Sequence, residues 1–239
     1  MPVCQDRCSG EQVRVMTPDL TSYDSIIVAV SGGKDGLACL FALLEAGAPK
    51  DCLELWHHEV DGQERFLNRR TLFVTGERAE ESPNRARYAA FEPHRTDTRH
   101  GTRRRRHVDH WRPVHQWSEA QVWDSLKRWN VVPALPYRIG FSRLSCATCI
   151  FGDARQFATI RWLDPARFER LVHYEQQFGC TIKRTVSLEQ FAEQDRPYDA
   201  ALSAPDLARA CLSSRPIPTV LTPAWEFPAG AFGLGAGPN

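Results

Sequence analysis

The first part of the chain alternates between continuous apolar runs and apolar positions at helical spacing. Residues 25–30 (SIIVAV) form a β-branched run, which is typical of a strand buried on both faces. Residues 35–46 then repeat apolar side chains at the spacing of a helix, and Gly47 and Pro49 end it. A second apolar run follows at 52–57 (CLELWH). This order of strand, helix and strand predicts a βαβ unit within a parallel sheet.

The connection to the next predicted strand is short. A third strand is expected at 71–75 (TLFVT), and little more than DGQERFLNRR separates it from the second. A crossover between adjacent parallel strands needs about a dozen residues or more. Either the two strands are not neighbours in the sheet, or a piece of the connection that is usual at this place is missing.

The remaining patterns predict one hairpin and several helices. Two extended runs at 86–92 and 105–111 enclose a basic loop, HRTDTRHGTRRRR, which is typical of a hairpin with a long tip. The capping box SEAQ, at Ser118, begins an amphipathic helix. Further helices are expected near 154–163, 165–178, 187–194 and 205–212.

These elements predict an α/β fold, with a parallel sheet, flanking helices and a mostly helical C-terminal part. The segment from Thr222 onward is rich in Pro and Gly, which is typical of a disordered tail. The expected organisation is a loosely ordered lead-in at 1–21, an α/β domain with the hairpin and a cysteine loop at 22–163, a helical extension at 164–215 and a disordered tail at 216–239.

The composition is that of a globular protein, with 42% hydrophobic and 25% charged residues among 239. A net charge of +1 gives no bulk attraction to nucleic acid. No apolar run approaches the roughly 20 residues that cross a bilayer, and the N-terminal MPVCQDRCSGEQ lacks the apolar region of a signal peptide. We therefore expect a cytoplasmic protein with no membrane partner. Its eight cysteines are then expected to be thiols or metal ligands rather than disulfides.

The turn between the first strand and the first helix carries the strongest chemical signal. Its sequence is Ser31-Gly32-Gly33-Lys34-Asp35. The glycines permit positive φ and a close approach of the backbone, and backbone N–H groups at a helix N-terminus favour an anion. The serine adds a hydroxyl donor and the lysine adds a positive charge. The spacing fits neither a Walker A loop nor a dinucleotide fingerprint, so the loop predicts a cradle for phosphate or pyrophosphate. The alternative is an ordinary glycine turn.

The stretch AVSGGKDGLACL resembles the PP-loop of the adenine-nucleotide alpha-hydrolase superfamily, in its phosphoadenosine phosphosulfate (PAPS) reductase-like branch. That branch usually reads Ser-x-Gly-Lys-Asp-Ser, so Gly36 here removes one hydroxyl. The resemblance implies a Rossmann-type, adenine-nucleotide alpha-hydrolase-like fold and ATP or a PAPS-type nucleotide as the ligand. If ATP is used, Mg²⁺ is expected, with Asp35 as its nearest carboxylate. The resemblance also implies further structure in the short connection after Gly62, which this chain lacks.

Other segments resemble the same family in the same order along the chain. ELWHHEVDG, with His57, resembles the end of the second strand, which faces the adenosine. TGERAEES resembles the segment beside the nucleotide phosphates, with the arginine as their charge partner. Its matching residues are Gly76, Arg78, Glu81 and Ser82. The alternatives are an ordinary strand-end histidine and an arginine that pairs only with the glutamate one turn away.

The cysteines predict a metal or redox site only in part. Cys146 and Cys149 have the spacing of two ligands of a [4Fe–4S] cluster or zinc, or of a redox dithiol. A metal site needs about four ligands. Cys4, Cys8 and Cys180 are the candidates for the others, and two unligated cysteines in a packed loop are the alternative. Members of the family that use thioredoxin carry a nucleophilic cysteine in a C-terminal Glu-Cys-Gly-Leu-His segment. The sequence around Cys211 does not match it.

The basic loop and the overall function have two interpretations each. Arg103, Arg104, Arg105 and Arg106 form either a solvated hairpin tip or a contact surface for nucleic acid, with Trp111 nearby for stacking. The chain is either an enzyme that acts on ATP or PAPS in sulfur transfer, with Lys34 and Arg78 as catalytic groups, or a non-catalytic binding protein of the same family.

Overall fold

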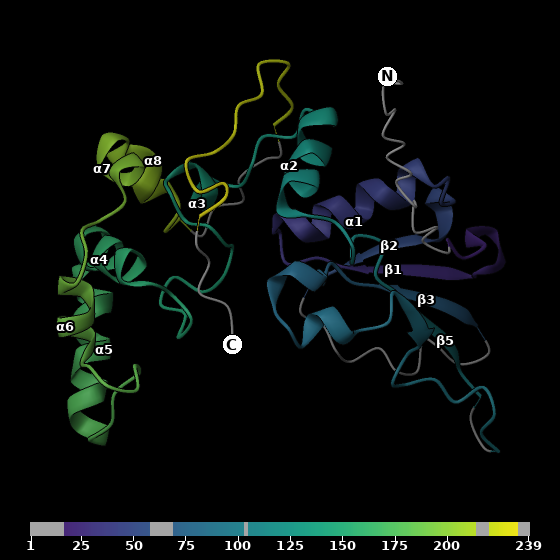
Figure 1. The fold of residues 1–239 in the computed structure, drawn as a ribbon, viewed down its shortest axis with the longest axis horizontal. Helices are drawn as coiled ribbons and strands as arrows, with labels where there is room; N and C mark the ends of the chain where they lie inside the picture. The colour runs from purple at the N-terminus through teal and green to yellow at the C-terminus, as the bar shows by residue number, and fades with distance from the viewer. Residues whose placement is uncertain (1–16, 58–68, 103–104, 214–219, 234–239) are drawn as a thin grey trace, which may run out of the picture.

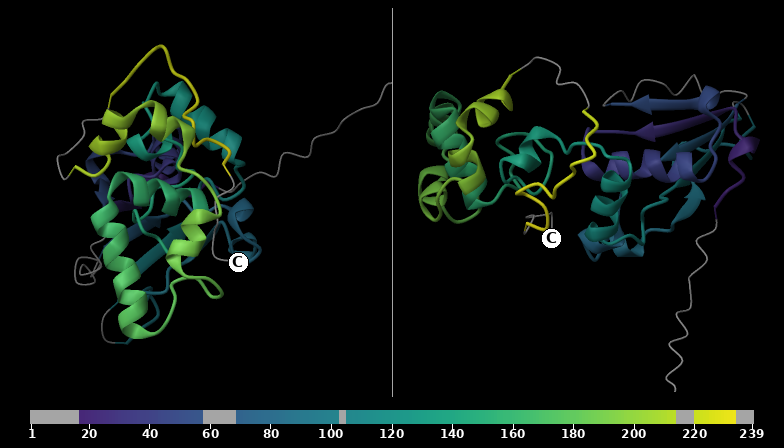
Figure 2. Two further views of the ribbon diagram at one scale, coloured as in Figure 1. Left: turned by 90° about the vertical axis from the view of Figure 1, so that its left-hand side faces the viewer. Right: turned by 90° about the horizontal axis from the view of Figure 1, so that it is seen from above.

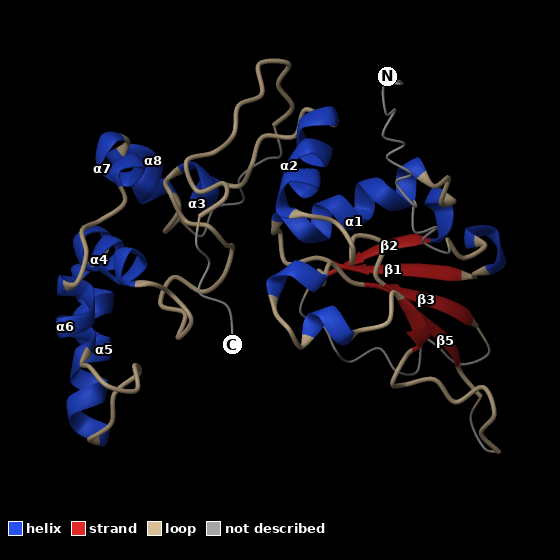
Figure 3. Cartoon of the chain, in the orientation of Figure 1, coloured by secondary structure: helices blue, strands red, loops and turns tan. Residues whose placement is uncertain are grey.

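The computed structural model describes residues 17–57, 69–102, 105–213 and 220–233. Figure 1 shows a sheet-containing part and a helical part, with α3 (Leu135–Arg138) between them. The two parts are coloured by secondary structure in Figure 3. No helix among the described residues is long and apolar enough to cross a membrane.

The sheet has five strands in the order β2-β1-β3-β5-β4. β1 pairs in parallel with β2 and β3, and β3 pairs in parallel with β5. Only β4 is antiparallel, against β5. The mostly parallel sheet with flanking helices confirms the predicted α/β, Rossmann-type fold. The strands are β1 (Ser25–Ala29), β2 (Leu53–Trp56), β3 (Arg70–Val74), β4 (Phe91–Pro93) and β5 (His107–Trp111).

The short connection between β2 and β3 has a topological explanation. The two strands lie on opposite sides of β1, so they are not neighbours in the sheet. This is the first of the two alternatives that the sequence left open. Residues 58–68 lie outside the described residues. Whether a piece that is usual in the family is missing there therefore stays a prediction.

The main core lies between the sheet and two helices, α1 (Lys34–Glu45) and α2 (Glu119–Arg128), which pack against each other. α1 forms because its apolar side chains recur at helical spacing, and Ser118 begins α2 by accepting a hydrogen bond from the N–H of Gln121. Strand residues such as Ile26 and Leu72 contribute to this core, together with Trp123 of α2. On the other face of the sheet, Ile27 and Val108 form a smaller cluster.

The hairpin is present but is shorter than predicted. Its first strand covers Phe91–Pro93 only, because Arg85–Arg87 form the 3-10 helix η5. The predicted lead-in ends in another 3-10 helix, η1 (Leu20–Ser22), and Leu20 is buried in the main core. The rest of that lead-in, residues 1–16, lies outside the described residues.

The helical part contains five helices among the described residues (Figure 2). α4 packs against both α5 and α6. The boundary expected after residue 163 therefore falls between two helices that pack together. Two small cores hold this part, one around Ile160 and Tyr198 and one around Phe157 and Leu188. The helices are α4 (Ala154–Leu163), α5 (Pro165–Phe178), α6 (Leu188–Glu193), α7 (Asp199–Ser203) and α8 (Pro205–Ala210).

Residues 220–233 form an ordered strap, whereas their Pro- and Gly-rich composition predicts disorder. The indole N–H of Trp225 donates to the carbonyl of Val131 at 2.7 Å. The N–H of Gly230 donates to the carbonyl of Tyr137 at 2.8 Å. A Cβ on Gly230 would lie 2.0 Å from the carbonyl oxygen of Phe141, so only glycine fits there. Close packing of small residues and one anchored indole therefore replace a regular element. Residues 216–219 and 234–239 lie outside the described residues.

Candidate functional site

The glycine loop joins the end of β1 to the start of α1. Gly32 has a φ of +79°, a conformation that disfavours any side chain. Gly33 is the N-cap residue of α1 and is extended, and it has no side chain with which to cap the helix. The first N–H groups of α1 therefore keep the capacity to bind an anion. Ser31 and Gly32 are exposed to solvent, while Lys34 is buried.

The predicted site residues gather at one edge of the sheet. β1, β2 and β3 are parallel, so the residues that follow all three strands meet at their carboxyl edge, where α/β folds bind ligands. Ala29 pairs with Trp56, which places His57 beside the start of the glycine loop. His57 is exposed there. Gly76 and Arg78 follow β3 at the same edge.

Gly76 sets the distance between β3 and the first turn of α1. A Cβ on Gly76 would lie 2.8 Å from the carbonyl carbon of Asp35 and 2.9 Å from its oxygen. Only glycine permits this backbone contact. The contact brings Arg78 to Asp35, and Arg78 Nε donates to Asp35 Oδ1 at 2.7 Å. The sequence predicted Arg78 as the charge partner of the phosphates and Asp35 as a loop residue and magnesium ligand, and the structure places the two against each other.

From the sequence, Lys34 is expected to add a mobile positive charge to the loop. In the structure its side chain is instead buried and paired. Its side chain is 7% exposed, and Nζ lies 3.5 Å from Asp35 Oδ2 and 3.7 Å from Glu119 Oε1. The ammonium also lies 5.7 Å from the ring centres of Trp123 and Tyr137. The charge therefore sits behind the glycine loop, held by two carboxylates and two aromatic rings.

Arg78 is buried as well and has its own carboxylate partners. Its NH1 group donates to Glu80 Oε2 at 2.6 Å and to the carbonyl of Trp117 at 3.4 Å. Burial, the largest single influence, opposes its charge, but the attraction and hydrogen bonds of Asp35, Glu80 and Glu81 together outweigh burial and raise the pKa of Arg78 above its ordinary value. Lys34 and Arg78 together face three carboxylates, those of Asp35, Glu80 and Glu119. A bound phosphate would have to compete with these partners.

Glu81 and Ser82 shape the turn that presents Arg78. Glu81 Oε2 accepts a hydrogen bond from the backbone N–H of Arg78 at 2.9 Å and also pairs with Arg85. Ser82 Oγ accepts from the N–H of Arg85 at 3.2 Å. These bonds close the 3-10 helix η4 (Ala79–Glu81) and the turn after it. The arginine side chain itself bonds to Asp35 and Glu80. The alternative of an arginine that pairs only with Glu81 therefore does not describe this structure.

Two residues that sequence analysis missed cover the glycine loop. The backbone N–H of Lys34 donates to the hydroxyl of Tyr137 at 3.3 Å. A Cβ on Gly32 would lie 3.2 Å from Leu144 Cδ2, so this leucine also lies against the loop. The segment appeared in the sequence only as a Pro- and Gly-punctuated loop. The only feature of the sequence that could have pointed to this contact is Tyr137 itself. It stands directly before RIGFSRLSC, a stretch that resembles the cysteine region of the family.

Cys146 and Cys149 lie on a turn next to this cover and are free thiols. The N–H of Cys149 donates to the carbonyl of Cys146 at 3.0 Å. Gln156 fixes the turn by donating to the carbonyls of Cys146 and Ala147. Within residues 17–57, 69–102, 105–213 and 220–233, no group of three or more His, Cys, Asp or Glu could hold a metal ion. The described donors thus fall short of the four that zinc or a cluster needs, and we derive no step through such a group.

The other cysteines do not complete a set in the described part of the chain. Cys39 is buried and donates to the carbonyl of Thr75, and burial raises the pKa of its thiol. Burial also raises the pKa of Cys211 to about 11, so this thiol is a poor nucleophile at neutral pH. Cys180 is exposed after the end of α5. Cys4 and Cys8 lie outside the described residues.

Buried polar side chains link the end of β3 to the hairpin. His110 Nδ1 accepts a hydrogen bond from Arg112 NH2 at 3.1 Å, and His110 Nε2 lies 2.7 Å from Thr75 Oγ1. Burial, followed by the charges of Arg112 and His94, lowers the pKa of His110 to about 4. His110 is therefore neutral near pH 7 and structural in this arrangement.

The basic segment turns two of its arginines inward. Arg99 bonds to Asp97 and Asp109, and Arg112 is buried and bonds to Glu77 and Glu92. The expectation that Trp111 stacks on nucleic acid is wrong, because this residue is 3% exposed and belongs to the main core.

The hairpin tip leaves less basic surface than its sequence suggests. Arg105 is exposed, and its Nε donates to the carbonyl of Gly101 at 3.4 Å. Arg103 and Arg104 lie outside the described residues. Contact with nucleic acid therefore stays a prediction, without the aromatic partner that sequence analysis assigned to it.

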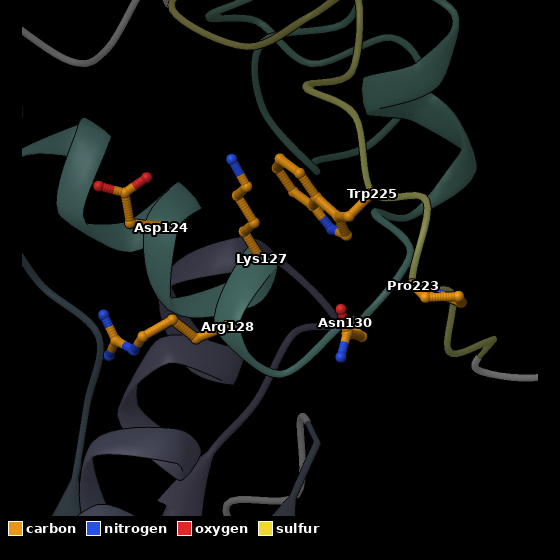
Figure 4. A pocket seen from close by; sticks show the side chains of 6 residues that line it. All are labelled: Asp124, Lys127, Arg128, Asn130, Pro223 and Trp225. Carbon is orange, nitrogen blue, oxygen red and sulfur yellow. The ribbon is translucent and has the colours of Figure 1, made fainter.

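A cavity of about 480 Å³ lies at the C-terminal end of α2, against the strap (Figure 4). The opposite end of α2 carries Glu119, which reaches Lys34, so this cavity is separate from the glycine loop. Its lining residues are Asp124, Lys127, Arg128, Asn130, Pro223 and Trp225.

Comparison with protein families agrees with this geometry. A family model described as the phosphoadenosine phosphosulfate reductase domain matches residues 57–151, from the end of β2 to the cysteine turn. The match begins after the glycine loop and includes Arg78, Glu119 and Tyr137. No curated protein and no solved structure matches the chain. Residues 57–151 are thus similar to the phosphoadenosine phosphosulfate reductase domain, which agrees with the resemblance of the sequence motifs to the PAPS reductase-like branch of PP-loop proteins.

Proposed function

We propose that the protein binds an adenine nucleotide, ATP or a PAPS-type nucleotide, with its phosphates on residues 31–34. One observation carries the proposal: the N-terminus of α1, which its N-cap residue Gly33 leaves without a side-chain cap and which Gly32 opens at positive φ, lies beside the buried cations Lys34 and Arg78. Backbone N–H groups and nearby cations are the partners that phosphate oxygens prefer. The carboxyl edge of a parallel sheet is also the usual ligand-binding place in this fold class.

The proposed reaction is a step of sulfur transfer. The enzyme would transfer the AMP part of ATP to an acceptor and release pyrophosphate, or support attack by an external thiol on the sulfur of a PAPS-type nucleotide, with the nucleoside bisphosphate as the leaving group. Lys34, Arg78 and the loop amides would stabilise the negative charge that develops in either transition state. Asp35 does not fit as a magnesium ligand in this arrangement, because Arg78 engages its Oδ1 and Lys34 its Oδ2. We route no step through a metal ion.

A second candidate is a binding protein without turnover. The observation that favours it is the pairing of both cations with the carboxylates of Asp35, Glu80 and Glu119. Charges neutralised in this way stabilise a developing anion less than free ones do. In addition, Cys211 is half-buried with a raised pKa, so it offers no attacking thiol.

One experiment separates the two functions. The protein is incubated with ATP, or with PAPS and a thiol reductant, and pyrophosphate, AMP and sulfite are measured, with Lys34→Ala as the control. Product that depends on Lys34 supports the enzyme. Binding without product supports the binding protein, and the absence of any nucleotide binding contradicts both.

A further inference from the structure

Tyr137 holds its phenol group against the start of α1. The side chain is 2% exposed, and its oxygen lies 3.3 Å from the backbone N of Lys34, the first residue of the helix. The ring packs edge-to-face on Trp123, with 5.2 Å between the ring centres. The backbone amide of Leu144 also interacts with the phenol oxygen. Two backbone amides, one from the start of α1 and one from residue 144, thus lie at one tyrosine oxygen, and the ammonium of Lys34 lies 5.7 Å from the centre of the ring.

The backbone of Tyr137 is fixed on two sides. Its carbonyl accepts hydrogen bonds from the N–H of Gly140 at 3.3 Å and from the N–H of Gly230, in the strap, at 2.8 Å. Its own N–H donates to the carbonyl of Ala134 at 3.1 Å. The hydroxyl is therefore presented to the glycine loop by a rigid support.

The hydroxyl accepts a hydrogen bond, but its own proton lacks an acceptor in the part of the chain that the structure describes. Buried donors are nearly always paired, because an unmade hydrogen bond costs the group's desolvation energy. Burial raises the pKa of Tyr137, so the phenol keeps this proton at neutral pH. The Lys34 amide donates to the tyrosine oxygen over 3.3 Å, beyond the usual 2.7–3.2 Å range for such bonds. A stronger acceptor can therefore replace the tyrosine oxygen as the partner of this amide.

We infer that the Tyr137 hydroxyl is a further ligand contact of the glycine loop and donates its proton in a hydrogen bond to a phosphate oxygen of the bound nucleotide. The inference rests on the proposed function and adds a residue to it. A phosphate oxygen at the start of α1 accepts from the Lys34 amide and supplies the acceptor that the tyrosine lacks. The contact recognises the anionic group rather than the adenosine.

Calorimetric titration of the full chain with ATP, inorganic pyrophosphate and adenosine tests this contact. Tyr137→Phe removes the hydroxyl and keeps the ring on Trp123. We expect affinity for ATP and pyrophosphate to fall roughly ten- to a hundredfold, the effect of one hydrogen bond to a charged group. Any adenosine binding should be unchanged. Tyr23→Phe is the matched control, because it also removes a buried hydroxyl, the one that donates to Asp109 at 2.8 Å.

The outcomes separate this inference from the proposed function. If the unmodified protein binds neither ATP nor pyrophosphate, the proposed function fails and the inference fails with it. If it binds both, and Tyr137→Phe binds them equally well or more tightly, the inference alone is overturned.

A second measurement decides the question if Tyr137→Phe does not fold. The chain has five tyrosines. Phe substitutions at the other four assign the ¹³Cζ resonance of Tyr137 by elimination in tyrosine-labelled protein. A hydrogen bond to pyrophosphate should shift this resonance on titration. An unchanged resonance at saturating pyrophosphate overturns the inference.

Discussion

The guanidinium of Arg78 and the carboxylate of Asp35 form an ion pair with 2.7 Å between Nε and Oδ1, which joins the end of β3 to the first turn of α1. The same guanidinium reaches Glu80 through NH1. A fork of fixed geometry is needed to hold two carboxylates at once, and only arginine provides it.

Arg78→Lys should therefore weaken the fold even though the charge is kept. We expect the free energy of unfolding to fall by about 1–3 kcal/mol, because one of the two buried hydrogen bonds cannot be made. Urea denaturation measures this. Arg209→Lys is the matched control, since the Arg209–Asp206 pair is exposed and its loss should change stability by less than about 1 kcal/mol. Equal effects of the two substitutions would contradict the role given to Arg78.

Gly76→Ala should separate β3 from α1. The new Cβ would meet the backbone of Asp35 at 2.8 Å, and backbone cannot give way as a flexible side chain does. We expect a loss of about 1–3 kcal/mol in unfolding free energy, together with weaker pyrophosphate binding. Gly36→Ala is the control, because its Cβ would make only ordinary contacts at 3.5 Å and should stabilise α1 by up to about 1 kcal/mol. A stable Gly76→Ala protein with unchanged binding would show that the close contact is dispensable.

Gly36→Ser should tighten the binding of pyrophosphate. The position is the third residue of α1, and a Cβ there makes only ordinary contacts at 3.5 Å. The serine restores the hydroxyl of the family pattern, and one added hydrogen bond to a charged group is expected to gain roughly tenfold in affinity. Calorimetric titration measures the change, with Gly36→Ala as the variant that adds the Cβ alone. The same affinity in both variants would mean that the hydroxyl does not reach the ligand.

Glu119→Gln should also tighten pyrophosphate binding, for an electrostatic reason. It removes a negative charge 3.7 Å from Lys34 Nζ, while the amide oxygen still accepts the hydrogen bond of the Trp123 indole. We expect an increase in affinity of several-fold, larger at low salt. Glu45→Gln is a close match at the other end of α1, because Glu45 also accepts from an indole, that of Trp129, and pairs with Arg128. If both substitutions change the affinity equally, the effect comes from the net charge of the protein and not from the ion pair between Glu119 and Lys34.

The free energy of unfolding should fall as the pH is lowered, because His110 then becomes protonated. Its pKa is about 4 in the folded protein, against an ordinary value of 6.5, so protonation favours the unfolded chain. The contribution is complete above pH 6.5 and is lost as the pH falls toward 4. It amounts to about 3 kcal/mol, since each pKa unit corresponds to about 1.4 kcal/mol. Urea denaturation at pH 7 and pH 5 measures the part that is lost over this interval, about 2 kcal/mol. His110→Gln should show a smaller difference between the two pH values, whereas substitution of His100, which is exposed, should not change that difference.

The parts of the molecule that follow from local sequence were predicted well. The run at 25–30 and the helical spacing after it predicted β1 and α1 within one residue at each end. Both patterns are local, because a buried strand and an amphipathic helix each show their period over neighbouring residues. The capping box at Ser118 located the start of α2 for the same reason. These signals, with the glycine loop, were enough to indicate the fold class and the phosphate cradle.

The contacts of the candidate site were beyond the reach of the sequence. Tyr137 contacts Lys34, which is 103 positions away in the chain, and a local pattern of apolar and polar residues cannot predict a contact over this separation. Burial of Lys34 behind the loop likewise depends on Glu119 and Trp123 of a distant helix. The strap was missed because its Pro and Gly content, typical of disorder, here permits a close fit of Gly230 on Phe141.

The strap also bears on the order in which the protein is made. Residues 220–233 support Val131 and Tyr137, which a ribosome completes about 90 positions earlier. A nascent chain can assemble β1, α1 and α2 while it is still attached, but the carbonyl of Tyr137 gains its partner Gly230 only about 90 residues after Tyr137 itself has been made. The cradle is therefore built first, and the residue that covers it is fixed in place last.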